Sequence, residues 1–260
     1  MNITLPDGSV RELKSGSSGL DLANDIGPGL AKAAIAVSVN GIQKDLCDPI
    51  IEDSKVSIIT IDSDEGLEIM RHTLTAQVLA RAVKNLYPDA KLAIGPTIND
   101  GFYYDFEFVE SIAPDDLVKI EKEMQKIINS NSAITKKLDS KKDALKVFAS
   151  IEESYKESII NESDQEDNFQ LYYQENDEFV DLCRGPHLPS LKHIGAFKLT
   201  KLAGAYWKGD SKNKMLTRIY GTAWKNEKDL NAYLHSIEEA EKRDHRKIGK
   251  EMNLFHFQEE

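Results

Sequence analysis

The stretch 3-ITLPDGSVREL-13 predicts how the chain begins to fold. Apolar and polar residues alternate on both sides of the Pro6-Asp7-Gly8 turn, which is typical of two short strands that form a hairpin. A short amphipathic helix follows at residues 18–26, SGLDLANDI, and Ser18 is placed to cap its first turn.

Two further strands are predicted at 34-AIAVSVNG-41 and 54-SKVSIITI-61, where β-branched residues are frequent. The order strand, strand, helix, strand, strand within residues 1–62 indicates a β-grasp sheet. The segment SDEGLE, residues 63–68, then changes the composition and marks a domain boundary.

Beyond this boundary the pattern predicts a second, larger α+β domain. Residues 67–87 form a strongly periodic helix that Pro88 ends, and 93-AIGPTINDGFYYDFEF-108 predicts two strands around an Asn-Asp-Gly turn. Further helices are expected over residues 114–131 and 141–160, and the segments from residue 170 to residue 224 are expected to be strands of one antiparallel sheet.

A long charged linker helix is predicted over residues 226–252. Its apolar side chains Leu230, Leu234, Ile237 and Ala240 form a narrow seam. The fold class is therefore α+β, with domains expected at 1–62 and 63–225 and a linker region at 226–260.

Composition limits the class of protein. The chain has 260 residues, of which 40% are hydrophobic and 30% charged, so it can bury a sizeable core in roughly two domains. No apolar run reaches the roughly 18 residues that a membrane helix needs, and a turn lies where a signal peptide would be apolar. Cys47 and Cys183 do not suggest a disulfide framework, so we expect a protein of the reducing cytoplasm without a membrane partner.

The net charge of −11 argues against a nucleic-acid partner, but the charge is unevenly distributed. Residues 184–225 contain nine basic residues and one acidic residue, and aromatic side chains are interleaved with them. This combination predicts an RNA-binding face, although a solvated basic face over an aromatic core is the alternative. The predicted tRNA-binding residues are Lys192, Lys198, Lys201, Lys208, Lys212, Lys214 and Arg218.

Several blocks in order together resemble the amino-terminal half of a bacterial threonyl-tRNA synthetase. They include ITLPDGS, DIGPGLAKA, AIGPTINDGFYYDF, ESYK, FVDLCRGPH, AGAYWKGDSKNKMLTRIYGTAW and RDHRKIGKEMNLF. The resemblance covers essentially the whole chain. It implies a TGS domain of β-grasp fold, an editing domain, and a helix that leads to a class II catalytic core.

The catalytic core of that family would begin where this sequence stops, at LFHFQEE. The resemblance therefore implies no cofactor for these 260 residues, because ATP and zinc belong to the core. The implied partner is the 3′ end and acceptor stem of tRNA(Thr), and full-length relatives are homodimers through the core. A piece of a whole ligase and a freestanding editing protein are both open alternatives.

The implied activity is hydrolysis of serine wrongly esterified to threonine tRNA. An aminoacylation pocket separates serine from threonine largely by one methyl group, worth about 1–3 kcal/mol, so a second hydrolytic sieve is needed. The family's editing pocket falls on six positions by residue matching. These are Tyr104, Lys156, Asp181, Cys183, Arg184 and His187.

The residue types suggest a role for each position. Lys156 would orient water or stabilise the oxyanion, and Asp181 would anchor that lysine or the substrate amine. His187 would be a base or a water holder, and Cys183 a small wall residue that limits the size of the amino acid. Tyr104 and Arg184 would contact the substrate. Taken singly, each residue also fits an ordinary structural role.

The first helix of the larger domain departs from the family pattern of two histidines four residues apart. Here 71-RHTLTAQVLARAV-83 is one residue longer and contains a single histidine, His72. Alignment from the left keeps His72 and puts Ala76 at the second site, whereas alignment from the right puts Thr73 and Gln77 at the two sites. His72 and Gln77 lie about 140° apart on a regular helix, so they converge only if the helix is irregular.

This departure leaves a non-catalytic tRNA-binding module as the alternative function. The related alanyl-tRNA synthetase editing domain holds zinc with a two-histidine helix and a Cys-x-x-x-His segment, but here one or two of those ligands are missing. We therefore predict no metal, and we interpret Cys183 and His187 as part of a pocket wall.

Overall fold

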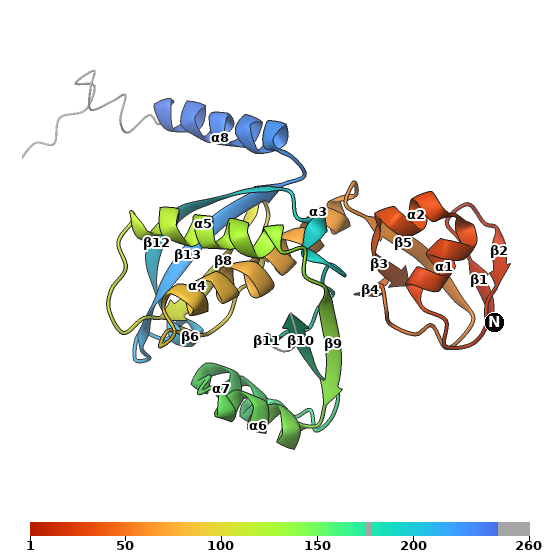
Figure 1. The fold of residues 1–260 in the computed structure, drawn as a ribbon, viewed down its shortest axis with the longest axis horizontal. Helices are drawn as coiled ribbons and strands as arrows, with labels where there is room; N and C mark the ends of the chain where they lie inside the picture. Colours follow the sequence, from red (N-terminus) through yellow and green to blue (C-terminus); the bar gives the residue numbers. More distant parts are fainter. Residues whose placement is uncertain (175–177, 244–260) are drawn as a thin grey trace, which may run out of the picture.

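The computed structural model, which describes residues 1–174 and 178–243, places the predicted N-terminal strands in one mixed sheet (Figure 1). Its strand order is β2-β1-β5-β3-β4, in which β1 runs parallel to β5 and the other pairs are antiparallel. The elements of this unit are β1 Asn2–Thr4, β2 Val10–Glu12, α1 Gly19–Ile26, α2 Pro28–Ala33, β3 Ala34–Val39, β4 Ile42–Asp45 and β5 Ser54–Thr60.

Helix α1 begins where the sequence predicts, because Ser18 and Asp21 cap each other. The Ser18 hydroxyl accepts from the Asp21 amide at 3.2 Å, and the Asp21 carboxylate accepts from the Ser18 amide at 2.8 Å. Leu22 on the inner face of this helix is fully buried with Ile3 and Val37 of the sheet. The predicted β-grasp arrangement is present.

The larger unit contains two sheets rather than the single sheet expected from the sequence. One sheet has the order β12-β13-β8-β6, with β7 paired to β8, and the other has the order β11-β10-β9. The strands are β6 Lys91–Leu92, β7 Thr97–Ile98, β8 Gly101–Glu107, β9 Ile134–Asp139, β10 Phe169–Gln174, β11 Phe179–Leu182, β12 Ala196–Tyr206 and β13 Met215–Trp224. The sheets separate because β10 pairs with β9, a strand that the sequence pattern did not predict.

The helices of the larger unit pack on these sheets and build two cores. They are α3 Asp64–Thr73, a π-helical turn at Leu74–Leu79, α4 Ala80–Leu86, α5 Asp116–Asn129, α6 Lys141–Ser150 and α7 Ser154–Glu162, with 3₁₀ turns at Leu191–His193 and Trp207–Gly209. Helix α5 lies across the larger sheet with α4 beside it, and Ile120 and Met124 meet Phe102 and Phe106 there (Figure 1). Helices α6 and α7 cover the smaller sheet, where Phe148 and Ile160 are fully buried.

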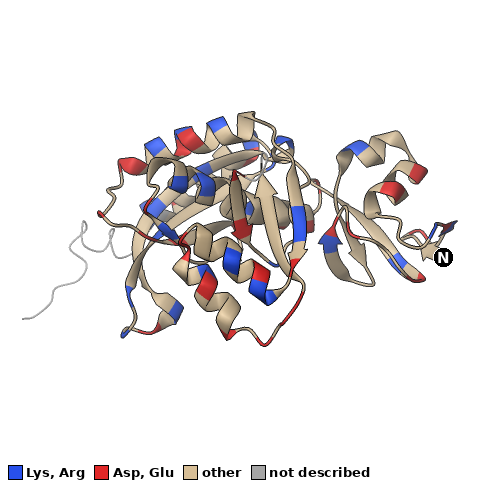
Figure 2. Ribbon diagram, turned by 60° about the horizontal axis from the view of Figure 1, so that its bottom comes forward, with Lys and Arg blue, Asp and Glu red and all other residues tan. Residues whose placement is uncertain are grey.

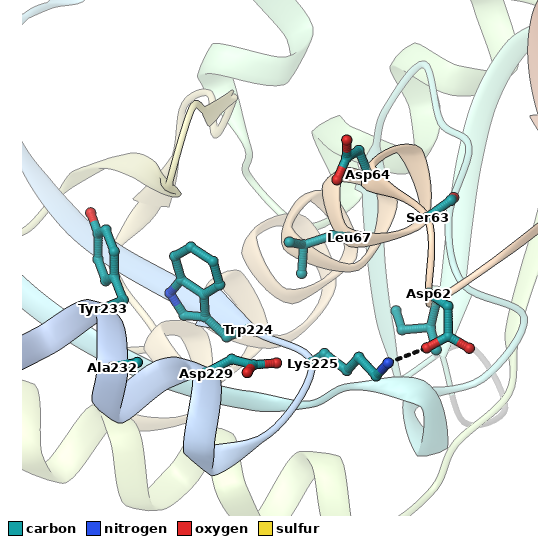
Figure 3. A pocket seen from close by; sticks show the side chains of 10 residues that line it. Asp62, Ser63, Asp64, Leu67, Trp224, Lys225, Asp229, Ala232 and Tyr233 are labelled. Atoms are coloured by element: carbon teal, nitrogen blue, oxygen red, sulfur yellow. Dashed lines mark ion pairs between the residues drawn. The ribbon is translucent and has the colours of Figure 1, made fainter.

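Helix α8, Glu227–Lys242, follows β13 directly. At its start Trp224 contacts Tyr233 with ring centroids 4.8 Å apart, and Lys225 forms an ion pair with Asp62 of the interdomain segment (Figure 3). Leu230 of the predicted apolar seam is buried, while the predicted continuation to residue 252 lies mostly outside the described residues. Within residues 1–174 and 178–243, no helix has the length and apolar character needed to cross a bilayer.

Candidate active site

The helix that begins at Asp64 carries the first candidate side chain, and its irregular turn decides which residues face the site. Ser63 caps it by accepting from the Gly66 amide at 3.0 Å. After Thr73 the backbone widens into a π-helical turn, in which the Ala80 amide bonds to the Thr75 carbonyl five residues earlier. This wide turn holds one residue more than a regular α-helical turn would.

The π-helical turn places His72 and Ala76 together on a cavity wall. Gln77 is fully buried on another side, where the Gln174 amide donates to its side-chain oxygen at 2.9 Å and to its backbone carbonyl at 2.6 Å. Thr73 is also fully buried. Thr73 and Gln77, which alignment from the right puts at the two family positions, therefore do not line the cavity, and their expected contact with substrate is corrected.

A lysine, a tyrosine and an aspartate from three different elements also meet at the cavity wall. Lys156 of α7 lies with its Nζ atom 2.6 Å from Asp181 Oδ1 on β11 and 3.0 Å from the hydroxyl of Tyr104 on β8. The Tyr104 hydroxyl donates to the other oxygen of Asp181 at 3.3 Å. The side chains of Lys156 and Asp181 are only 4% and 2% exposed, so this charged pair is shielded from bulk water.

Burial controls the protonation of Tyr104. Loss of solvent and the neighbouring Asp181 carboxylate raise the pKa of Tyr104 well above its usual value. The hydroxyl therefore keeps its proton and remains a donor to Asp181. The Lys156 ammonium is the one positive group of this cluster.

Two stacked imidazoles and a thiol form a second cluster. The rings of His72 and His187 are parallel within 8° with centroids 4.6 Å apart, and His72 Nε2 lies 2.8 Å from the Cys183 sulfur. Burial lowers the pKa of both histidines below its usual value, so both rings are neutral at pH 7.

The tautomer of His187 follows from its contact with Thr73. The Thr73 hydroxyl gives its single hydrogen to the Ile69 carbonyl at 2.8 Å, so it can only accept from His187 Nδ1 at 3.1 Å. Nδ1 of His187 is therefore protonated, and Nε2 carries the lone pair. This Nε2 atom is buried and has no hydrogen-bond partner among the described residues.

A cavity of about 550 Å³ joins the two clusters. Six of the predicted site residues line it, and the structure brings them together from distant parts of the sequence. They are His72, Tyr104, Lys156, Asp181, Cys183 and Arg184. His187 stands behind His72 instead of on the cavity surface, because its side chain is buried against Tyr172 and Thr73.

Several lining residues were missed by sequence reasoning. Gly95 allows the loop to approach Tyr104 closely, since a Cβ atom there would lie 2.2 Å from the Tyr104 ring. The Gly95-Pro96 pair in AIGPTINDG was the available signal for this approach. Asn168 and Gln170 also line the cavity, and nothing in their local sequence marked them.

The cavity at Lys156 differs in its chemistry from the hollow beside α8. The hollow beside α8 has a volume of about 380 Å³ and is lined by Leu67, Trp224 and Tyr233, with an exposed ion pair at its edge (Figure 3). The cavity at Lys156 instead combines a buried cation, one neutral imidazole and apolar lining residues, which is a usual composition of a ligand pocket.

The same histidines and thiol are the one group of possible metal donors in the described part of the chain. One nitrogen of His72, one of His187 and the Cys183 sulfur lie within 4.8 Å of one another. These are ligand types that zinc accepts, but Ala76 supplies no fourth donor, so a closed four-ligand structural site is not formed by these residues.

The predicted RNA-binding face is less positive than its local sequence suggests. Figure 2 shows acidic and basic residues interspersed over the larger unit. Lys198, Lys208 and Lys214 form ion pairs with Glu121, Glu162 and Glu107, which come from other elements. Acidic residues distant in sequence therefore offset much of the local basic excess.

Arg218, one of the predicted tRNA-binding residues, is engaged in contacts within the fold. Its guanidinium donates to both oxygens of Asp105, at 2.7 and 2.9 Å, and stacks 3.7 Å from the Tyr103 ring centroid. These contacts hold β13 to β8. Lys192, Lys201 and Lys212 are exposed and have no acidic partner among the described residues, although Lys201 lies over the Tyr220 ring.

Comparison with known protein families places this site in context. The TGS domain family matches residues 1–60, and the family described as threonyl and alanyl tRNA synthetase second additional domain matches residues 170–220. The second match contains Gln170, Asp181, Cys183 and His187, which form or support one side of the cavity.

Similar whole proteins are threonine–tRNA ligases. The chain is 55% identical over 258 residues to that of Hahella chejuensis, 51% over 258 residues to that of Prochlorococcus marinus, and 54% over 260 residues to that of Paramagnetospirillum magneticum. Each alignment covers 99% of this chain but 40% of the relative. The chain thus spans about two fifths of the length of these relatives.

Proposed function

This chain belongs with the threonine–tRNA ligases, of which it matches the TGS and second additional domains, and we propose that it hydrolyses a wrongly formed aminoacyl ester on tRNA. The substrate of the proposal is serine esterified to the terminal adenosine of tRNA(Thr). The single observation that carries it is the buried Lys156–Asp181 pair, which lines one cavity together with His72 and Cys183.

Lys156 is the proposed oxyanion partner. When water attacks the ester carbonyl, negative charge develops on the carbonyl oxygen, and a fixed ammonium in a water-poor site stabilises that charge strongly. Asp181 holds the lysine ammonium in place through the ion pair, and Tyr104 limits its direction by accepting a hydrogen bond. The cluster therefore needs little reorganisation during the reaction.

His72 is the proposed base. Its lowered pKa keeps the ring neutral, so it can accept the proton of the attacking water. The new bond joins the water oxygen to the carbonyl carbon, and the bond from that carbon to the ribose oxygen breaks. The ribose oxygen then takes the proton back from His72, which leaves free serine and an uncharged tRNA.

The wall of the cavity is proposed to select the amino acid. Cys183 and Ala76 are small side chains on that wall, and Gly95 brings the opposite loop close to Tyr104. A seryl group with its amine and hydroxyl fits among polar groups there, while the rest of the cavity accommodates the ribose. We place the reaction in the cytoplasm, where aminoacyl-tRNA is used.

Deacylation of seryl-tRNA(Thr) by the purified chain tests the proposal. We expect release of serine faster than in buffer, and a loss of about 10²–10³ in kcat when the Lys156 charge is removed. Because Lys156→Met alone leaves Asp181 unpaired, the double variant Lys156→Met/Asp181→Leu tests activity in a folded protein. Lys146→Ala is the matched control, since its exposed lysine is also paired with an acid, Asp143, and lies outside the predicted tRNA-binding set.

A non-catalytic tRNA-binding module is the second candidate function. It is favoured by Ala76, which puts a methyl group without hydrogen-bonding capacity beside His72 on the cavity wall. Serine release no faster than in buffer, together with retained binding of tRNA(Thr), would support this module and reject hydrolysis. Lys201→Ala/Lys212→Ala should then lower the slope of log affinity against log salt by about 2, one for each lost phosphate contact.

A further inference from the structure

Asp45 of the N-terminal unit reaches into the larger unit directly behind the candidate site. It is the last residue of β4, and its side chain is 9% exposed. Oδ1 accepts from the His187 backbone amide at 2.8 Å. Oδ2 accepts from the Tyr172 hydroxyl at 2.7 Å and from the Lys136 ammonium at 2.8 Å. One carboxylate therefore binds three separate segments of the other unit.

The contacts of Asp45 fix both the backbone and the ring environment of His187. The amide contact holds its main chain, while Tyr172, bonded to the same carboxylate, meets the His187 ring edge-on with centroids 4.3 Å apart. His187 in turn stacks on His72, the proposed base. Asp45 is thus two contacts away from His72 and does not line the cavity itself.

The bend before His187 packs closely against Tyr172 and Asp45. Gly185 has a φ angle of +63°, and a Cβ atom on it would lie 2.0 Å from the Tyr172 hydroxyl and 3.3 Å from Asp45 Oδ2. There is no room for this bend to move toward Asp45. The Asp45 carboxylate and the Tyr172 side chain together support residues 185–187 from one side.

The neighbouring Asp48 provides a natural contrast. It also forms an ion pair with Lys136, and one of its oxygens accepts from the Asp45 amide at 3.1 Å. Neither His187 nor Tyr172 is among its hydrogen-bond partners in the described residues. Asp48 therefore shares the interdomain ion pair of Asp45 but not its contact with the site.

We infer that Asp45 is a positioning residue for the hydrolytic site, through which the N-terminal unit holds the His187 bend and the stacked His72 ring in their working arrangement. This inference rests on the proposed function, and it gives the TGS unit a part in hydrolysis in addition to any contact with tRNA. Hydrogen bonds to an ionised carboxylate are stronger than those between neutral groups, so a carboxylate is an effective group for holding residues 185–187 in position. A displacement of about 1 Å at a catalytic group can lower the rate about 100-fold.

Kinetics of the full 260-residue chain test the inference with Asp45→Asn and Asp48→Asn. The asparagine at position 45 has the shape of the aspartate, but its amide nitrogen cannot accept from Tyr172 or Lys136. We expect Asp45→Asn to lower kcat for seryl-tRNA(Thr) about 10- to 100-fold with KM within about twofold of wild type. Asp48→Asn should keep kcat within about twofold. Equal losses in the two variants would overturn the inference, because they would reflect only the shared ion pair.

Nuclear magnetic resonance separates this inference from the proposed hydrolysis. In Asp45→Asn the amide proton of His187 should move upfield as its charged acceptor is lost, and the ring signals of His72 and His187 should shift. In Asp48→Asn these signals should stay in place. Unchanged His187 and His72 signals in Asp45→Asn would overturn the inference whether or not the chain hydrolyses the ester.

Tyr172→Phe keeps the test decisive if Asp45→Asn does not fold. It removes one donor to Asp45 and preserves the ring that contacts His187. We expect a loss in kcat smaller than that of Asp45→Asn, and a small shift of the His187 amide signal. Wild-type kcat together with an unshifted His187 amide in Tyr172→Phe would count against the inference.

Discussion

Helix α7 contributes one residue to each of two lysine–carboxylate ion pairs. The two pairs differ strongly in their exposure to solvent. Lys156 near its start binds Asp181 with both side chains under 5% exposed, whereas Glu162 at its end binds Lys208 with side chains 57% and 42% exposed. Water and salt screen the second pair but hardly reach the first. An ion pair therefore indicates a functional site here through its burial, because Lys156 and Glu162 both line the same cavity. The number of charges in the local sequence indicates little.

The largest effect should come from breaking the buried pair. Lys156→Met leaves the Asp181 carboxylate buried without its cation, which should lower the free energy of unfolding by about 3–5 kcal/mol. Urea denaturation measures this loss. The double variant Lys156→Met/Asp181→Leu should recover most of it, and a single variant as stable as wild type would contradict the comparison.

For each group left unpaired, a smaller effect is expected from removing a buried neutral acceptor. Thr73→Val takes the acceptor from the His187 ring and from the Leu188 amide, and each unsatisfied buried donor costs about 1–3 kcal/mol. Thr75→Val is the matched control, since its hydroxyl bonds only to the Arg71 carbonyl of its own helix among the described residues. Urea denaturation of both variants gives the difference. Equal losses would show that the contact with residues 187–188 is not the cause.

Acidification should weaken the fold through the two stacked histidines. Burial lowers the pKa of His72 and His187 from 6.5, so below pH 6.5 the unfolded chain binds protons that the folded chain does not. Stability is therefore full above pH 6.5 and should fall as the pH decreases below it. Urea midpoints between pH 7.5 and 5.5 test this, and His72→Asn should flatten the slope. A midpoint that rises on acidification would contradict the assignment of neutral rings.

The smallest effect should follow from breaking the exposed pair. Lys208→Ala removes an ion pair whose members are both hydrated, so the thermal midpoint at physiological salt should not change measurably. Calorimetry at low and at physiological salt measures it. A loss comparable to that of Lys156→Met would remove the distinction between the two pairs.

Local patterns predicted the elements that local chemistry controls. The Pro6-Asp7-Gly8 and Asn99-Asp100-Gly101 turns join the expected strand pairs, and Ser18 caps the expected helix. These features depend on residues that are close in the sequence. The resemblance placed Lys156 and Asp181 correctly as neighbours, although no spacing rule links positions 25 residues apart on a helix and a strand.

Long-range pairing explains what the sequence could not predict. Strand β9 has a largely polar sequence and becomes a strand through its pairing with β10, which separates the second sheet. Asp45 meets His187 across 142 positions. The acidic partners of the predicted RNA-binding face lie on α5, α7 and β8. A count of charges over residues 184–225 alone therefore overstated the positive electrostatic potential of that face.

The π-helical turn at Leu74–Leu79 allows the helix to be one residue longer without a change in the orientation of the side chains that follow it. An additional residue in a continuous α-helix would rotate every later side chain by about 100° and turn Val83 away from α5. Here the wide turn absorbs that rotation, and Val83 remains fully buried in the same core as Ile120. The arrangement of His72 at one end of the helix is thus uncoupled from the packing of the other end, so a change of one residue in length between them need not disturb the core.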